Sequence, residues 1–319
     1  MLLQWLAVVA GLILLVWSAD RFVIGASVTA EKLGVPVLVI GMLLMGFGTS
    51  APEMLVAIQA SLDGSPDLAV GNALGSNIAN IALILGLTAL IAPIPVATGL
   101  VRKEIPLLLV VTLCAALLLL NQQLVWWKGV LLVTGLLAFI GYSYWLTRQG
   151  QSDALLEEVE STLQPMSTSR ALFWLLVGLV LLIVSSRLLV WGAVELALSW
   201  GVSEMVVGLT LVAVGTSLPE LAASLAAARK GQAELVLGNI IGSNVFNLLA
   251  VLPIPALLAS GSQLGSELLW RDLPVMLGLT VLLLLVSLGR QGQEKINRTE
   301  GAGLLLCFVG YQGWLFLGS

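Results

Sequence analysis

Two acidic residues lie well inside segments that are otherwise apolar. Glu53 and Glu220 are set in long runs of Leu, Ala, Val and Gly, whereas most other acidic residues fall in polar stretches. A charge at the centre of a bilayer costs at least about 2.5–3.5 kcal/mol. Neither these two segments nor the apolar segments that follow them contain a Lys or Arg for a compensating ion pair. The sequence therefore predicts that a mobile cation neutralises these carboxylates.

Each carboxylate follows a short motif that is rich in oxygen atoms. The motif reads G-T-S-A-P-E at 48–53 and G-T-S-L-P-E at 215–220. Pro52 and Pro219 lack a backbone N–H and disrupt the preceding helical turn, which leaves carbonyl groups without helical donors. Such carbonyls are tolerated at membrane depth only where they line a cavity or meet an ion. Further predicted ligands are the backbone near Gly48 and Gly215 and the hydroxyls of Thr49, Ser50, Thr216 and Ser217.

A second polar motif, G-N-x-x-G-S-N, begins at Gly71 and again at Gly238. At about 100° per residue, two polar side chains of the motif share one helical face with an Asn three residues beyond it. These side chains are Asn72, Ser76 and Asn80 in the first copy and Asn239, Ser243 and Asn247 in the second. They are explained either by helix packing, with Gly allowing close approach, or by an ion path. We predict the ion path for Ser76, Asn80, Ser243 and Asn247, and both interpretations stay open for Asn72 and Asn239.

The chemistry of these ligands restricts the ion. Oxygen ligands without His or Cys select hard cations, which are sodium, calcium, potassium or magnesium. Magnesium is disfavoured because it keeps most of its waters. Two carboxylates neutralise one calcium ion, so calcium is favoured as the divalent substrate, and the same oxygens can instead hold sodium ions. Mutual exclusion at one shared site is sufficient for antiport.

Other chemistries find little support in the composition. The chain has no His and two Cys, so the familiar zinc sites and His acid/base catalysis are excluded. Cys114 and Cys307 lie in apolar runs and are predicted to be buried structural thiols. The net charge of −4, without clustered Lys and Arg, argues against nucleic acid binding. No nucleotide loop or nucleophile–base pairing is present, so we expect no ATP, no cofactor and no enzyme activity.

Membrane-spanning helices must position the two motifs. Of the 319 residues, 59% are hydrophobic and 10% are charged, with a mean hydropathy of +1.04, whereas a soluble protein has about 25% charged residues. The chain is predicted to be an all-α integral membrane protein. No Lys or Arg precedes Leu2, so we expect no cleaved signal peptide. Hydropathy predicts ten spans at 2–19, 37–60, 68–91, 105–120, 125–146, 171–190, 204–228, 234–258, 273–289 and 302–317.

The chain contains an internal repeat. Residues 41–80 align without gaps with 208–247 at a constant offset of 167, and 16 of the 40 positions are identical. The predicted organisation is a first repeat at 1–146, a linker at 147–170 and a second repeat at 171–319. Each repeat holds five spans, an odd number, so the two copies are inverted about an axis in the membrane plane. Inverted repeats of this kind usually build secondary transporters, with the substrate site at the midplane.

The basic residues predict the orientation. Loops after odd-numbered spans hold 11 of the 14 Lys and Arg residues, and loops after even-numbered spans hold three. The positive-inside rule therefore places the odd-span loops and the linker in the cytoplasm and both termini outside. The polar linker is expected to be solvated.

The four motifs together resemble the two α-repeats of the cation/calcium exchanger superfamily, and most closely its bacterial inner-membrane sodium/calcium exchangers of the YrbG type. The resemblance covers nearly the whole chain. It implies the ten-helix sodium/calcium exchanger fold, in which spans 2, 3, 7 and 8 form the ion-binding core and spans 1 and 6 are long tilted helices.

The resemblance also implies roles for individual residues. Glu53 and Glu220 would be central ligands shared by calcium and sodium, and Thr49 and Thr216 would give backbone and hydroxyl oxygens to calcium. Ser50, Ser217, Ser76 and Ser243 would help form sodium sites, and Asn80 and Asn247 would complete the middle of the site. One departure concerns Asn247, where several exchangers carry Asp. The core then has two formal negative charges instead of three, which leaves the ion selectivity open.

The predicted function is secondary active antiport, in which inward sodium flow drives calcium outward across a bacterial inner membrane by alternating access. One alternative is a proton/calcium or potassium-dependent sodium/calcium exchanger. Another, from a different class, is a passive cation channel or a scaffold without transport activity. The expected partners are calcium ions, sodium ions and the lipid bilayer, and we expect a monomer.

Overall fold

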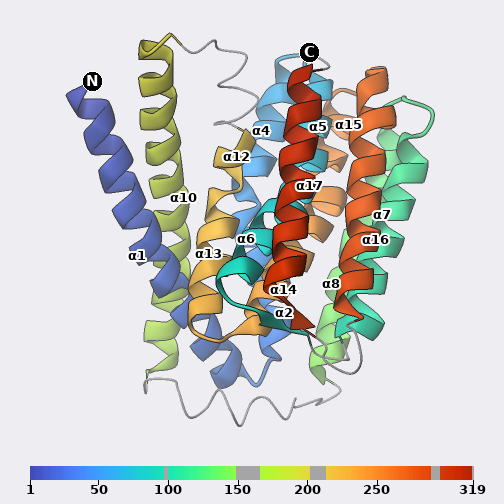
Figure 1. The fold of residues 1–319 in the computed structure, drawn as a ribbon. Coiled ribbons are helices and arrows are strands. Elements are labelled where there is room, and N and C mark those ends of the chain that lie inside the picture. The colour runs from blue at the N-terminus through green and yellow to red at the C-terminus, as the bar shows by residue number, and fades with distance from the viewer. Residues whose placement is uncertain (97–99, 149–165, 202–212, 289–294, 318–319) are drawn as a thin grey trace.

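A computed structural model of the protein describes residues 1–96, 100–148, 166–201, 213–288 and 295–317. The regular secondary structure of the described residues is helical, apart from two strands of two residues each (Figure 1). By length and composition, seven helices among the described residues can cross a membrane. Part of the predicted linker 147–170 and the first residues of the predicted span 204–228 lie outside the described residues.

The helical segments follow the ten predicted spans in order. In the first repeat, three of the five segments are built from several helical pieces that include a π-helical turn. The five segments are α1 (Leu2–Leu33); α2 (Val37–Ile40), η1 (Gly41–Met45), α3 (Gly46–Thr49) and α4 (Ala51–Leu62); α5 (Pro66–Ile78), η2 (Ala79–Leu85) and α6 (Gly86–Ile91); η3 (Leu100–Glu104) and α7 (Ile105–Leu119); and α8 (Trp126–Arg148).

The second repeat has the same order of segments. They are α10 (Thr168–Ser199); α12 (Ala213–Thr216) and α13 (Leu218–Arg229); α14 (Ala233–Phe246), η5 (Asn247–Val251) and α15 (Pro253–Leu258); η6 (Leu268–Asp272) and α16 (Leu273–Ser287); and α17 (Arg298–Leu317). The N-terminal end of α1 and the C-terminal end of α17 lie at the same end of the bundle (Figure 1). This arrangement requires an even number of crossings.

The predicted bounds of the first and sixth spans were too short. α1 continues to Leu33 and α10 to Ser199, beyond the expected ends at 19 and 190. Hydropathy finds only the apolar part of a helix. In α1 the helix continues through charged residues such as Asp20 and Glu31, which leave the hydrogen-bonded backbone intact.

Strand pairings in the loops follow the inverted symmetry. β1 (Ile94–Pro95) pairs antiparallel with β2 (Lys295–Ile296), and an isolated bridge joins Gln123 to Gln263. α7 crosses the bundle between Pro95 and Gln123, so these two pairings lie at opposite ends of the molecule. Each pairing joins a loop of the first repeat to a loop of the second repeat.

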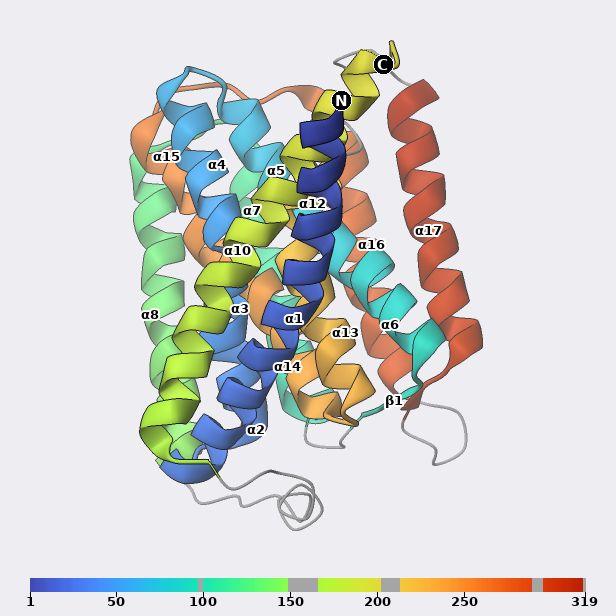
Figure 2. The ribbon, with the colours of Figure 1, turned by 90° about the vertical axis from the view of Figure 1, so that its left-hand side faces the viewer.

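α1 and α10 form a long antiparallel pair on one side of the bundle (Figure 2). Glycines bring their backbones together, because a Cβ at Gly25 would lie 2.4 Å from the Leu175 backbone N, and one at Gly178 would lie 2.8 Å from the Phe22 backbone. Small residues allow such close approach in membrane helices. The two helices therefore pack as one unit.

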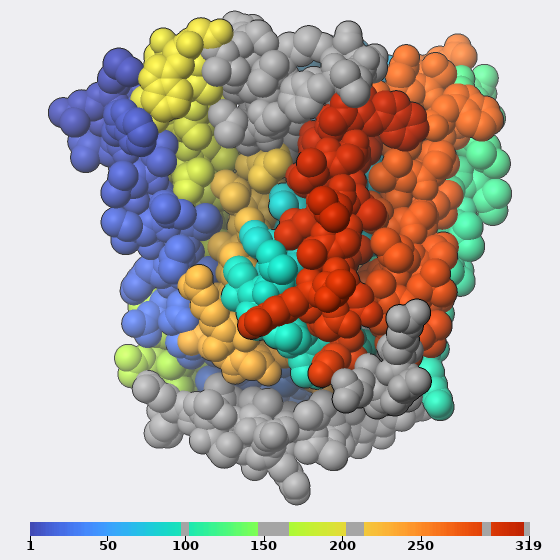
Figure 3. Space-filling view, in the orientation of Figure 1, coloured from blue at the N-terminus to red at the C-terminus, as the bar shows by residue number. Residues whose placement is uncertain are grey.

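The outer surface of the bundle carries many large apolar side chains, as a lipid-facing surface requires. α17, red in Figure 3, lies against α6 and presents Leu306 and Val309 outward. The predicted burial of Cys114 and Cys307 was wrong, because both side chains are exposed. An apolar run in a membrane protein predicts contact with lipid as readily as burial against protein.

Candidate ion-binding site

The predicted helix breaks position the two central carboxylates. α3 ends at Thr49, Ser50 has φ −77° and ψ 2°, and α4 begins at Ala51. The second copy breaks in the same way at Ser217, with φ −90° and ψ 7°. Glu53 and Glu220 consequently lie in the first turns of α4 and α13, where the helix dipole favours an anion. Both carboxylates are 1% exposed.

Glu53 and Glu220 are buried at equivalent helix breaks, one in each repeat. In the described part of the chain the ion pairs are Lys32–Glu31, Lys230–Asp20 and Arg271–Asp272, and none involves Glu53 or Glu220. Two buried carboxylates at one place repel each other unless protons or cations neutralise them.

Thr49 connects the first motif to the second repeat. Its hydroxyl donates to the Met45 carbonyl at 2.9 Å and lies 3.3 Å from both Asn239 Oδ1 and Ser243 Oγ. Gly242 has no side chain, which allows the helices to approach closely here. A Cβ at Gly242 would lie 2.3 Å from the Met42 carbonyl oxygen. Thr49 and Ser243 are therefore held side by side at the centre of the protein.

Two asparagine pairs join the repeats about the inverted axis. Asn80 Nδ2 donates to Asn244 Oδ1 at 3.3 Å, and Asn247 Nδ2 donates to Asn77 Oδ1 at 3.1 Å. The two hydrogen bonds are equivalent, because the offset of 167 relates Asn80 to Asn247 and Asn77 to Asn244. In both pairs the predicted site residue, Asn80 or Asn247, uses its amide nitrogen for this bond, which leaves its carbonyl oxygen available for a ligand.

The sequence motifs contain several buried oxygen atoms that have no hydrogen-bond partner. Among the described residues, the motif oxygen atoms that are buried without a hydrogen-bond partner are Ser50 Oγ, Glu53 Oε2, Asn80 Oδ1, Ser217 Oγ, Glu220 Oε1 and Oε2, and Asn247 Oδ1. A buried polar atom without a partner is costly. These seven oxygen atoms come from both repeats, and oxygen is the ligand atom that calcium binds.

The first copy of the second motif lines a cavity of about 440 Å³. The cavity extends along α5 from Asp67 in its first turn to Ala79, and it includes Asn72, Ser76 and Thr216. Ser76 Oγ lies 3.5 Å from Glu53 Oε1 at the inner end of this path. The first copy therefore joins the buried carboxylate to an open space.

The second copy is packed instead. Asn239 is 0% exposed and donates to the Glu220 carbonyl at 3.3 Å and to Ser224 Oγ at 3.0 Å. Asn72, its equivalent, has a buried Nδ2 without a partner beside the cavity. In this structure Asn239 therefore takes part in helix packing, whereas Asn72 lines the cavity.

Gly48 and Gly215 lie where α10 packs against the two helix breaks. The Gly215 carbonyl accepts a hydrogen bond from Ser186 Oγ at 3.1 Å. A Cβ at Gly48 would lie 2.6 Å from the Leu179 side chain, and one at Gly215 would lie 2.5 Å from the Val190 side chain. Both glycines therefore give α10 room to lie against the helix breaks.

Sequence reasoning missed Asn77 and Asn244, which hold the site asparagines in place. They lie off the helical face shared by Asn72, Ser76 and Asn80, so the periodicity argument passed over them. Their identity in both copies of the repeat was the available signal. Ser186 and Ser224 were also missed, because neither belongs to a repeated identity.

The architecture and its paired polar motifs define a helical membrane protein of the inverted-repeat transporter type. The family profile described as "Sodium/calcium exchanger protein" matches residues 3–145 and 170–317. The chain belongs to this sodium/calcium exchanger family, within the cation/calcium exchangers. The resemblance inferred from the motifs is confirmed.

Similar proteins cover the chain from end to end. The putative antiporter CaxA of Alkalimonas amylolytica is 47% identical over 318 residues, which is 99% of each chain. The inner membrane protein YrbG of Escherichia coli is 40% identical over 319 residues, covering 99% of this chain and 96% of YrbG.

A solved structure confirms the fold. The sodium–calcium exchanger NCX_Mj, in a structure soaked without Na⁺ and Ca²⁺, matches with a TM-score of 0.83 and 34% identity, covering 98% of this chain and 99% of that chain. The predicted ten-helix, inverted-repeat exchanger fold is therefore correct.

Proposed function

We propose that the protein exchanges sodium for calcium by alternating access at a site between the two repeats. The observation that carries the proposal is the set of seven unpartnered buried oxygen atoms in the motifs, three of which belong to Glu53 and Glu220. Thr49, Thr216, Ser76 and Ser243 add hydroxyl oxygens at the edge of this set. Because the ligands are all oxygen and only two are carboxylates, one calcium ion or several sodium ions satisfy them, but not both together.

The cavity along α5 supports an access path from one side of the membrane. The distribution of basic residues favours an outside location for the N-terminal end of α5, so we propose that the structure is open to the outside and closed to the cytoplasm. We further propose that repeats 1–146 and 171–319 are joined by a cytoplasmic linker at 147–170. The protein would be a monomer in a bacterial inner membrane, with both termini outside.

Calcium-45 uptake into proteoliposomes tests the coupling. Vesicles loaded with sodium should take up calcium when diluted into sodium-free medium, and collapse of the sodium gradient should stop the uptake. Uptake driven by a pH gradient alone would support proton coupling instead, and a requirement for a potassium gradient would support potassium-dependent exchange. Continuous calcium flow without any counter-ion would identify a channel and contradict the proposal.

A further inference from the structure

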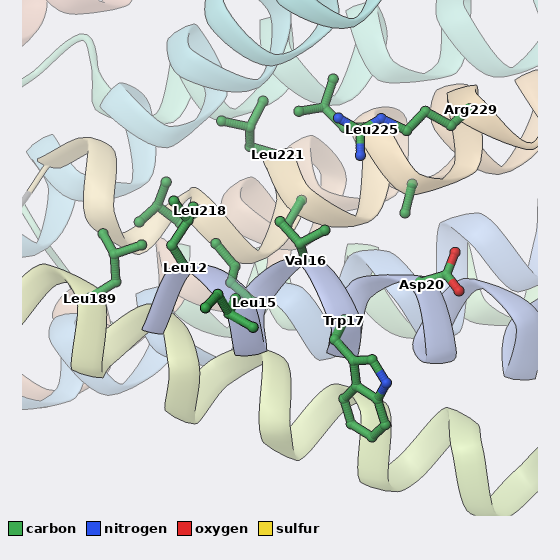
Figure 4. Close-up of a pocket in the computed structure, with 13 residues that line it drawn as sticks. Leu12, Leu15, Val16, Trp17, Asp20, Leu189, Leu218, Leu221, Leu225 and Arg229 are labelled. Atoms are coloured by element: carbon green, nitrogen blue, oxygen red, sulfur yellow. The ribbon is translucent and has the colours of Figure 1, made fainter. Parts of the chain in front are cut away.

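α1 contacts the core helix α13 less extensively than it contacts α10. A groove of about 670 Å³ lies between α1 and α13, and the side chains that line it are mainly apolar (Figure 4). Leu12 and Val16 of α1 face Leu218 and Leu221 of α13 across this groove. The α1–α10 contact, in contrast, is made at backbone distance through glycine. The α1–α10 pair can therefore move against the core more easily than its members can separate.

Polar contacts fasten α1 to the core at one end of the groove. Lys230 Nζ lies 2.6 Å from Asp20 Oδ1, and Ser27 Oγ donates to Gln232 Oε1 at 2.9 Å. Lys230 and Gln232 belong to the short loop between α13 and α14. Asp20 and Lys230 therefore hold the α1–α10 pair in its observed position, and we call them the first latch.

Both members of the first latch have structural equivalents in the other repeat. The offset of 167 relates Asp20 to Arg187 and Lys230 to Asp63. The offset holds in three dimensions on α1 and α10, because Ser18 donates to the Leu15 carbonyl and Ser185 to the equivalent Leu182 carbonyl.

The loop positions are equivalent as well. Asp63 and Lys230 are the residues that end α4 and α13, and each precedes a glycine with positive φ, 75° at Gly64 and 71° at Gly231. Asp63 and Arg187 thus form a second acid–base pair in which the signs are exchanged: the base is now on the long helix and the acid is on the loop.

The second pair is not formed in this structure. Arg187 and Asp63 are both exposed, and among the described residues neither takes part in an ion pair. Asp63 accepts hydrogen bonds from Gln59 Nε2 at 3.0 and 2.9 Å. An acidic residue at the C-terminal end of a helix is unfavourable with respect to the helix dipole. A basic partner in another conformation would explain why an acid stands there.

We infer that Asp63 and Arg187 form a second latch, which closes when the first latch of Asp20 and Lys230 opens. This inference rests on the proposed alternating access. In an inverted-repeat transporter, the opposite state is approached by exchanging the conformations of the two repeats. In the exchanged state, the residues equivalent by the offset of 167 would make the same contact. Arg187 would then lie beside Asp63, as Asp20 lies beside Lys230 in this structure. Each latch then stabilises one end state of transport.

Cysteine cross-linking tests the latches in the full-length protein. The background carries Cys114→Ala and Cys307→Ala, because both native thiols are exposed. One variant adds Asp20→Cys with Lys230→Cys, and a second adds Asp63→Cys with Arg187→Cys. A control pairs Asp20→Cys with Asp63→Cys, which introduces two thiols at opposite ends of the bundle. Oxidation is carried out in proteoliposomes with sodium, with calcium or without either ion.

Both latch variants should form an intramolecular disulfide, in proportions that change in opposite directions between ionic conditions. Each disulfide should stop calcium exchange, and a reductant should restore it. Absence of the second cross-link above the control in every condition, in a protein whose wild type exchanges calcium, would overturn the latch alone. A wild type that does not exchange would overturn the proposed function and the latch with it.

Charge variants give a second measurement that does not depend on disulfides. Val56 lines the cavity, so Val56→Cys reports its opening through reaction with an impermeant maleimide. In that background, Arg187→Gln should raise the ratio of cavity-open to cavity-closed protein about two- to fivefold, and Lys230→Gln should lower it by a similar factor. The double reversal Asp63→Arg with Arg187→Asp should restore the ratio. Equal ratios in all variants would overturn the inference.

Discussion

The two copies of G-N-x-x-G-S-N have the same sequence pattern and opposite surroundings. On α14, Gly238 and Gly242 lie against the backbone of η1 and α2, and a Cβ at Gly238 would lie 2.8 Å from the Leu38 carbonyl oxygen. On α5, a Cβ at Gly75 would meet nothing within 4 Å. Close packing requires glycine in the second copy only, yet both copies have it.

Under the proposed alternating access, the surroundings of each copy would belong to a conformational state and not to the sequence of that copy. If the protein alternates between states, α5 must at some stage be packed as closely as α14 is here. The glycines of α5 would then be needed in a conformation other than this one. Substitutions at equivalent positions of the two copies test this comparison.

The largest effect on calcium exchange is expected at the two carboxylates, because each repeat contributes one of them to the proposed site. Glu53→Gln and Glu220→Gln should each lower calcium exchange at least about 100-fold, because either change removes half of the negative charge that holds the ion. Calcium-45 uptake into sodium-loaded proteoliposomes measures the loss, with the amount of inserted protein as the control. If one variant retained wild-type exchange, the carboxylates would not share one site.

The reactivity of an introduced thiol should differ between the two copies of the second motif. In the background without native cysteines, Asn72→Cys should react with an impermeant thiol reagent about tenfold faster than Asn239→Cys. Asn72 lines the cavity, whereas Asn239 is 0% exposed. Reaction rates of purified protein in ion-free detergent solution provide the measurement. Equal rates would mean that the cavity does not reach the first motif in solution.

Alanine at the equivalent glycines should give different losses. Gly242→Ala places a methyl group against the backbone of Met42, so it should destabilise the protein by about 1–3 kcal/mol, seen as a lower thermal unfolding temperature. Gly75→Ala should leave that temperature unchanged and lower exchange severalfold, because the methyl group interferes only when α5 becomes packed. A Gly75→Ala protein with full exchange would contradict the idea that the copies trade surroundings.

The sequence predicted features that the copies share and could not predict those in which they differ. Apolar run lengths, the offset of 167 and the pairing of Pro52 with Pro219 are local or repeated, so they located the spans, the inverted repeat and the helix breaks. The separate environments of Asn72 and Asn239 depend on the position of distant helices, and identical residues carry no signal for that. The lipid exposure of Cys114 was missed for a related reason, since hydropathy does not distinguish lipid from a protein core.

The smallest effect concerns the charge at the centre of the site. Asn247→Asp adds a third carboxylate to a site that holds two, and should tighten apparent calcium affinity about three- to tenfold, because ligand charge sets the affinity of oxygen sites. Asn80→Asp is the matched variant, since Asn80 and Asn247 each bond an asparagine of the other repeat. Calcium dependence of exchange measures both. Similar gains would show that the two copies contribute equally at the ion, however unequal their access paths are. A gain at Asn247 alone would show that the asymmetry extends into the binding site, and no gain at either position would place both amide oxygens outside the calcium coordination sphere.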